Sequence, residues 1–101
     1  MKVRWTKNAI EHLAGIYEYI AANSPAYAKR TVDKITKRSM QMGRMPYSGR
    51  KVPEYEADDI RELIEYPYRV IYRIKTRQID VLAVIHGARQ LPECLDSLPP
   101  A

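Results

Sequence analysis

The hydrophobic pattern of this chain changes its period near the middle. From Lys7 to about Gly43, apolar residues recur at helical spacing, which is typical of helices with one buried face. From Asp59 onward, the segments DIRELIEYPYRVIYRI and IDVLAVIHG are rich in Ile, Val, Leu and Tyr, which is typical of strands. A chain of 101 residues has the length of a single domain, so both halves must share one fold. The pattern therefore predicts one α+β domain over residues 1–101.

Two helix patterns occupy the first half, and very few residues separate them. The apolar residues of the first pattern fall on one helical face: Ala9, Leu13, Ile16, Tyr17 and Ile20. This pattern ends near Asn23, and Ser24-Pro25 then supplies a capping side chain followed by proline at the first helical position. The second pattern continues with Ala28, Val32 and Ile35. Such a short connection predicts that the two helices fold back as an antiparallel hairpin.

The second half contains three predicted strands, and VRW near the start is a candidate for one more. Pro67 predicts an edge, a bend or a bulge between the first two of the three, and KTRQ predicts a hairpin turn between the last two. A symmetric hairpin pairs Ile74 with Ile79, Arg73 with Asp80, Tyr72 with Val81 and Val70 with Ala83. The face expected to pack on the helices then carries Val70, Tyr72, Ile74, Val81, Ala83 and Ile85. The predicted order is β-α-α-β-β-β, with the helical hairpin on one face of an antiparallel sheet.

Basic residues gather on the opposite face of the predicted sheet. Arg69, Arg73 and His86 lie there, and Arg89 follows the last strand. Guanidinium groups bind phosphates and carboxylates in forked geometry, and the net charge of +5 favours anionic partners such as nucleic acid or an acidic protein. Simpler explanations stay open: Arg73 pairs only with Asp80, Arg69 extends along the rim, and the basic charge only aids solubility.

The same face also carries the apolar residues Ile71, Leu82 and Val84. Apolar side chains on an open face indicate that something covers them. Two candidates are another protein and the C-terminal tail, residues 92–101, which we expect to be flexible.

Motifs for metals, cofactors and export are missing from the sequence. Cys94 is the only cysteine, which excludes an internal disulfide and favours a cytoplasmic protein. There is no zinc, P-loop or dinucleotide motif, and His12 and His86 lie far apart, so we expect neither a metal nor a cofactor. We find no signal-peptide pattern and no apolar stretch of transmembrane length.

Five short motifs follow one another along nearly the whole chain: Trp5 and Ala9 with three residues between them, IYEYIAANSP, PYSGRKVPE, IREL with YRVIYRI, and VIHGARQLP. Together they resemble the RelE/ParE superfamily of toxins from bacterial type II toxin-antitoxin systems, also known as plasmid-stabilisation proteins. The resemblance implies the fold predicted above, growth arrest, and neutralisation by a cognate antitoxin in a hetero-oligomer. Such a partner would cover Ile71, Leu82 and Val84, and an acidic one would be attracted by the positive charge.

One activity known on this fold is cleavage of messenger RNA on the ribosome. The resemblance to that branch implies that Arg69 and Arg89 contact phosphate, and His86 would be the candidate acid or base. However, Ile60 and Glu62 occupy the positions of the lysine pair that is typical of the nucleases. A late catalytic tyrosine is missing as well.

The other activity known on this fold is inhibition of DNA gyrase. The tetrad HGAR at the end of the last predicted strand resembles this branch, so we expect a gyrase inhibitor without enzyme activity. Its target-binding residues would be Arg69, Arg73 and Arg89. A third alternative is a non-toxic nucleic-acid-binding or adaptor module of the same fold.

Overall fold

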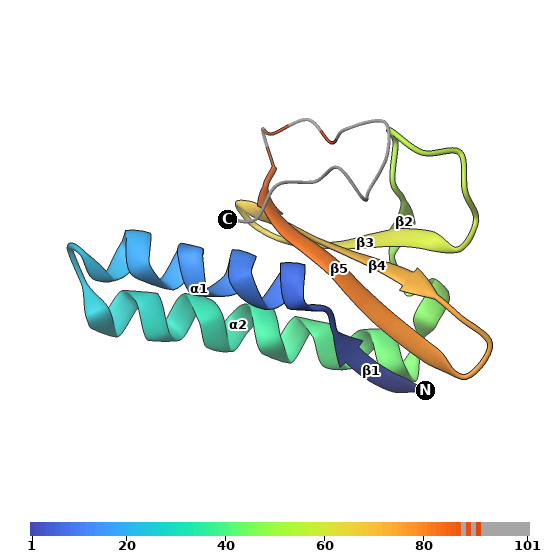
Figure 1. Ribbon diagram of the computed structural model, residues 1–101, viewed down its shortest axis with the longest axis horizontal. Coiled ribbons are helices and arrows are strands. Elements are labelled where there is room, and N and C mark those ends of the chain that lie inside the picture. The colour runs from blue at the N-terminus through green and yellow to red at the C-terminus, as the bar shows by residue number, and fades with distance from the viewer. Residues whose placement is uncertain (88, 90, 92–101) are drawn as a thin grey trace.

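The chain folds into two layers, a helical hairpin and a five-stranded sheet (Figure 1). The computed structural model describes residues 1–87, 89 and 91, and the predicted tail of residues 92–101 lies outside them. The elements follow in the order β1 (Lys2–Trp5), α1 (Lys7–Ala21), α2 (Pro25–Arg44), a 3₁₀ turn (Pro46–Ser48), β2 (Arg50–Lys51), β3 (Ile60–Glu65), β4 (Tyr68–Ile74) and β5 (Gln78–His86). The predicted α+β fold, with a helical hairpin on a sheet, is confirmed.

The sheet is mixed, because its first strand runs parallel to its last. The strand order is β1-β5-β4-β3-β2, in which β1 pairs with β5 in parallel and the other neighbours are antiparallel. The sequence pattern did not predict this parallel pairing or the two-residue strand β2. β1 ends at Trp5, opposite Val81, so the outer edge of β5 beyond Val81 is not paired with β1.

Side-chain caps begin both helices. Ser24 Oγ accepts a hydrogen bond from the Tyr27 backbone N–H at 3.2 Å, and Pro25 is the first helical residue, as predicted. Thr6 Oγ1 caps α1 in the same way, accepting from the Ala9 N–H at 3.2 Å. The short connection lays the two helices side by side beneath the sheet (Figure 1). Within the described residues, neither helix is long and apolar enough to span a membrane.

A β-bulge changes the predicted register between β4 and β5. The pairs Ile74–Ile79, Arg73–Asp80 and Tyr72–Val81 form as predicted, but the register shifts between Tyr72 and Ile71. Ile71 then pairs with Ala83, and Val70 pairs with Val84, so the predicted Val70–Ala83 pair is wrong. An extra residue in one strand reverses the face of every side chain beyond it. Val84 therefore faces the helices, whereas Ala83 and Ile85 face away, contrary to the prediction.

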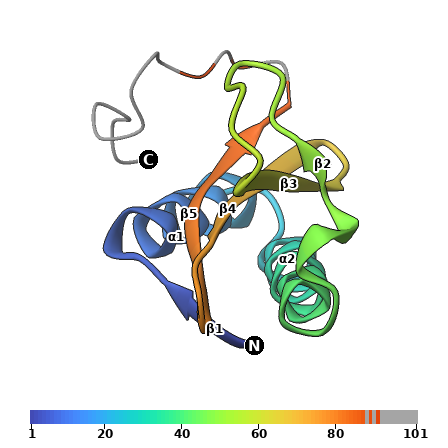
Figure 2. The same cartoon turned by 90° about the vertical axis from the view of Figure 1, so that its right-hand side faces the viewer.

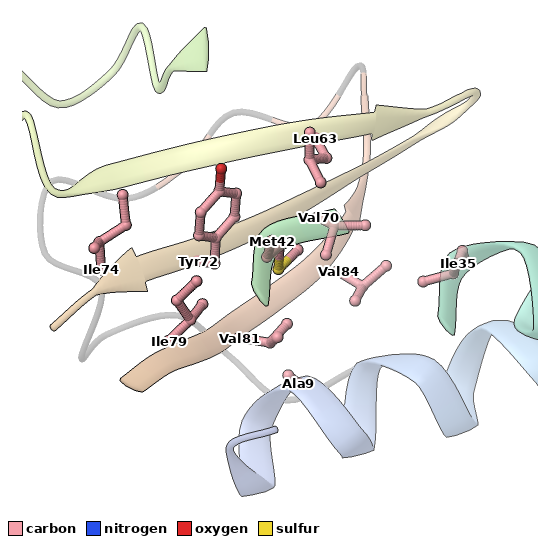
Figure 3. Close-up of a cluster of buried hydrophobic side chains, with 10 residues drawn as sticks. All are labelled: Ala9, Ile35, Met42, Leu63, Val70, Tyr72, Ile74, Ile79, Val81 and Val84. Carbon is pink, nitrogen blue, oxygen red and sulfur yellow. The ribbon is translucent and has the colours of Figure 1, made fainter. Parts of the chain in front are cut away.

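Hydrophobic clusters lie on both faces of the sheet. The cluster on the helical side contains Ala9, Ile35, Met42, Leu63, Val70, Tyr72, Ile74, Ile79, Val81 and Val84 (Figure 3). The cluster on the other side contains Val52, Ile60, Ile71, Ala83, Ile85 and Leu91. The loop between β2 and β3 contributes Val52 to the second cluster, and it lies across the sheet from the helices (Figure 2). The face predicted to be open is therefore covered by the chain itself.

The bulge and this cover change the expected exposure of the three apolar residues predicted to bind an antitoxin. Ile71 is fully buried in the second cluster, and Val84 is buried in the first. Leu82, the residue at the bulge, is only partly buried against the second cluster. The expected exposure of Ile71 and Val84 was wrong, because the prediction included neither the bulge nor the loop that packs on this face.

Candidate functional site

A groove of about 370 Å³ lies between α1 and the adjoining ends of β4 and β5. Its lining residues come from these three elements and from the segment after β5: His12, Gly15, Ile16, Tyr19, Tyr68, Val84, Ile85, His86 and Arg89. The fold therefore brings the predicted site residues His86 and Arg89 to one groove. It also brings His12 there, although His12 and His86 lie far apart in the sequence.

His86 lies at the end of β5, directly across the ladder from Tyr68. The two rings meet edge to face, with centroids 6.0 Å apart and an interplanar angle of 80°. The Tyr68 hydroxyl can donate a hydrogen bond near pH 7, because a phenol is protonated there and burial raises its pKa further. His86 and Arg89 are both exposed. The groove thus offers aromatic surface, an imidazole and a guanidinium group to a binding partner.

Helix α1 is attached to β5 through hydrogen bonds that begin at Val81, where β1 ends, and continue along the edge of β5 beyond it. Thr6 Oγ1 donates to the Val81 carbonyl at 2.8 Å, and Asn8 Nδ2 donates to the Leu82 carbonyl at 3.4 Å. The Val84 N–H donates to His12 Nδ1 at 3.1 Å. The His12 imidazole is buried, and the hydrogen bond that it accepts from β5 fixes α1 as one wall of the groove. The sequence signal for this role is the helical spacing of Asn8 and His12, which places both side chains on one face of α1.

Arg69 lies inside the protein and not on an exposed face. Only 6% of the residue is accessible, and its guanidinium group lies between two glutamates. Nε donates to Glu62 Oε1 at 2.7 Å, while Nη1 and Nη2 donate to the Glu54 carboxylate at 2.9 and 2.8 Å. The expectation that Arg69 is exposed and available for phosphate was wrong, because two internal carboxylates bind the guanidinium group.

This ion cluster also connects three parts of the chain. Glu54 comes from the loop after β2, and its Oε2 accepts a hydrogen bond from the Leu91 N–H at 3.2 Å. Glu62 also accepts from Arg50 Nε at 3.1 Å. The hydrogen bonds from Arg69 lower the pKa of Glu54 to about 2, and those from Glu54 and Glu62 raise the pKa of Arg69. Glu54 was missed from the sequence, since nothing in VPEY indicates that its carboxylate turns inward.

Arg73 keeps an exposed side chain but does not form the predicted pair with Asp80. Its Nε lies 3.9 Å from Asp59 Oδ2, and 40% of the side chain is exposed. Asp80 is instead bound by Lys75 at 2.7 Å and by Arg4 at 3.4 Å. The strands place Arg73 opposite Asp80, but the parallel strand β1 brings Arg4 beside the same carboxylate.

Among the described residues, no three His, Cys, Asp or Glu side chains lie close enough together to hold a metal ion. Neither the groove nor the ion cluster around Arg69 therefore offers a set of metal ligands within that part of the chain.

Two comparisons with known proteins point to the same toxin-antitoxin system, and each covers most of the chain. The family model for the ParE toxin of the type II toxin-antitoxin system parDE matches residues 3–91. A solved structure described as the chromosomal ParDE toxin-antitoxin system from P. aeruginosa is similar, with 25% sequence identity and a TM-score of 0.70. The similarity covers 85% of this chain and 95% of that chain. No curated protein matches the chain.

Proposed function

The chain belongs to the ParE toxin family of type II toxin-antitoxin systems, and from this premise we propose that it arrests growth by inhibiting DNA gyrase. The proposed target-binding surface is the groove between α1 and β5, with Arg89 at its rim. Tyr19 projects from α1 beside it and is 82% exposed. Exposed tyrosine and arginine side chains are typical anchors of protein interfaces.

The burial of Arg69 is the observation that carries the choice of gyrase over messenger RNA. A nuclease needs cationic groups that reach the phosphate in the transition state. The Arg69 guanidinium group is already bound by Glu54 and Glu62, and releasing it would leave two carboxylates without their main partner. This arrangement supports a structural role for Arg69 and leaves Arg89 as the target-binding arginine of the groove, since Arg73 lies near the other end of β4 and does not line it.

We also propose that a cognate antitoxin neutralises the protein by binding α1. Ile10 and Tyr17 lie two helical turns apart on this helix and are 54% and 41% exposed. Apolar side chains at this spacing fit the apolar face of a partner segment. Leu82 keeps the partial exposure needed for a peripheral contact, whereas Ile71 and Val84 are buried within the chain.

Induced expression in bacteria tests this proposal. We expect growth arrest with a DNA damage response, relief by a co-expressed antitoxin, and weaker toxicity for Arg89→Ala. His86→Ala should leave much of the toxicity intact. Codon-specific cleavage of messenger RNA would support the ribonuclease alternative. Normal growth with abundant folded protein would support the non-toxic module.

A further inference from the structure

The positive charge of the chain is concentrated on one helix. α2 carries six basic residues, Lys29, Arg30, Lys34, Lys37, Arg38 and Arg44, and a single acidic residue, Asp33. Its excess of five charges equals the net charge of the whole chain, because the other eleven basic and eleven acidic residues balance. The excess of basic over acidic residues in the chain is therefore carried by α2, which lies along the lower edge of the molecule in Figure 1.

The basic residues of α2 form an exposed row. Lys34, Lys37 and Arg44 line a hollow of about 660 Å³, and no ion pair within the described part of the chain involves them. Asp33 is paired with Lys29 at 3.3 Å and so does not compensate this row. At about 1.5 Å of rise per residue, Lys34 and Arg44 lie roughly 15 Å apart along the helix.

Two further charged side chains line the hollow. Arg38 is held in place by donating from Nη2 to the Ile64 carbonyl at 3.0 Å. Glu65 also lines the hollow and is its one acidic group among the described residues. Four basic side chains therefore outnumber a single carboxylate there, and the hollow keeps a net positive charge.

We propose that this basic face of α2 binds the phosphate backbone of duplex DNA. Lysine is depleted from interfaces between proteins, whereas rows of lysine and arginine are the usual contacts to phosphate. Duplex DNA carries about one negative charge per 1.7 Å of its axis, and it holds a dense layer of counterions. A row of basic side chains therefore releases more counterions when it binds a duplex than when it binds a single strand. The choice of DNA among duplexes rests on the proposed function, because gyrase acts on duplex DNA.

Fluorescence anisotropy with a labelled DNA duplex tests the inference without gyrase. The test variant is Lys34→Gln with Lys37→Gln, and the matched control is Lys7→Gln with Arg77→Gln, which removes the same charge from exposed positions elsewhere. Circular dichroism checks the fold of both variants. We expect about tenfold weaker binding for the test variant and a slope of log K against log salt that is smaller by about 1.8. The control should retain near-native binding.

Three results would overturn the inference: no duplex binding at low salt, equal losses in both variants, or tighter binding of duplex RNA or polyglutamate than of duplex DNA. Polyglutamate binding that depends on Lys34 and Lys37 would indicate an acidic protein partner. Since the assay contains no gyrase, DNA binding by a chain that does not inhibit gyrase would refute the proposed function and leave phosphate binding established.

Discussion

Replacing Glu54 with glutamine should destabilise the fold in a pH-dependent manner. The carboxylate accepts hydrogen bonds from Arg69 and from the Leu91 N–H, and the first of these partners lowers its pKa from 4.5 to about 2. The difference between a pKa of 4.5 and one of about 2 corresponds to roughly 3.4 kcal/mol of folding free energy, at about 1.36 kcal/mol per pKa unit. This value applies only if water does not screen the interaction. Since 19% of the side chain is exposed, we expect Glu54→Gln to cost about 2 kcal/mol at pH 7.

Urea denaturation at several pH values measures this cost. The folded pKa of Glu54 lies below its unfolded value, so its stabilisation is complete above about pH 4.5 and is lost as the pH falls toward 2. The difference in unfolding free energy between wild type and Glu54→Gln should shrink over that range. Glu56→Gln, at an exposed neighbouring position, is the control and should change stability little. A cost below about 0.5 kcal/mol at pH 7, or one that does not vary with pH, would refute the reasoning.

Three further predictions concern the core and its edges, and each is checked by the free energy of unfolding. Tyr72→Ala should cost about 3 kcal/mol or more, because it removes a buried ring and the hydrogen bond to the Pro46 carbonyl. Arg73→Ala should cost about 1 kcal/mol at most, because its side chain is partly exposed. The reverse order of these two costs would contradict the assignment of the two residues to opposite faces of the sheet. His12→Leu should cost about 1–3 kcal/mol, because the buried Val84 N–H loses its acceptor, and an unchanged stability would argue against that bond. Gly49→Ala should cost about 1–3 kcal/mol, since a Cβ there would lie 2.6 Å from the Glu62 carbonyl oxygen; a neutral result would mean that the backbone moves freely.

Local sequence patterns predicted the helices and the start of the sheet register. The Ser24 cap and Pro25 act within one helical turn, so the beginning of α2 could be read from the sequence. The register next to the KTRQ turn was predicted correctly because the turn itself fixes it. The bulge could not be predicted, since Leu82, Ala83, Val84 and Ile85 are all apolar and either face of that segment can be buried.

The candidate site was predicted only in part. His86 ends β5 and Arg89 follows three residues later, so the sequence order already placed the two close together. The predicted face of His86 was wrong, because beyond the bulge this side chain lies beside α1 and not on the face away from the helices. The burial of Arg69 depends on Glu54, 15 residues away in an irregular loop. No periodic pattern describes such a loop, so an arginine in a strand was assigned to the surface by default.

A supercoiling assay with purified DNA gyrase tests the central claim most directly. We predict that the folded chain inhibits supercoiling and causes cleaved DNA complexes to accumulate, and that Arg89→Ala weakens both effects. A parallel reaction on translating ribosomes should leave messenger RNA intact. Full supercoiling activity in the presence of the folded chain, together with cleavage of messenger RNA on the ribosome, would contradict the account.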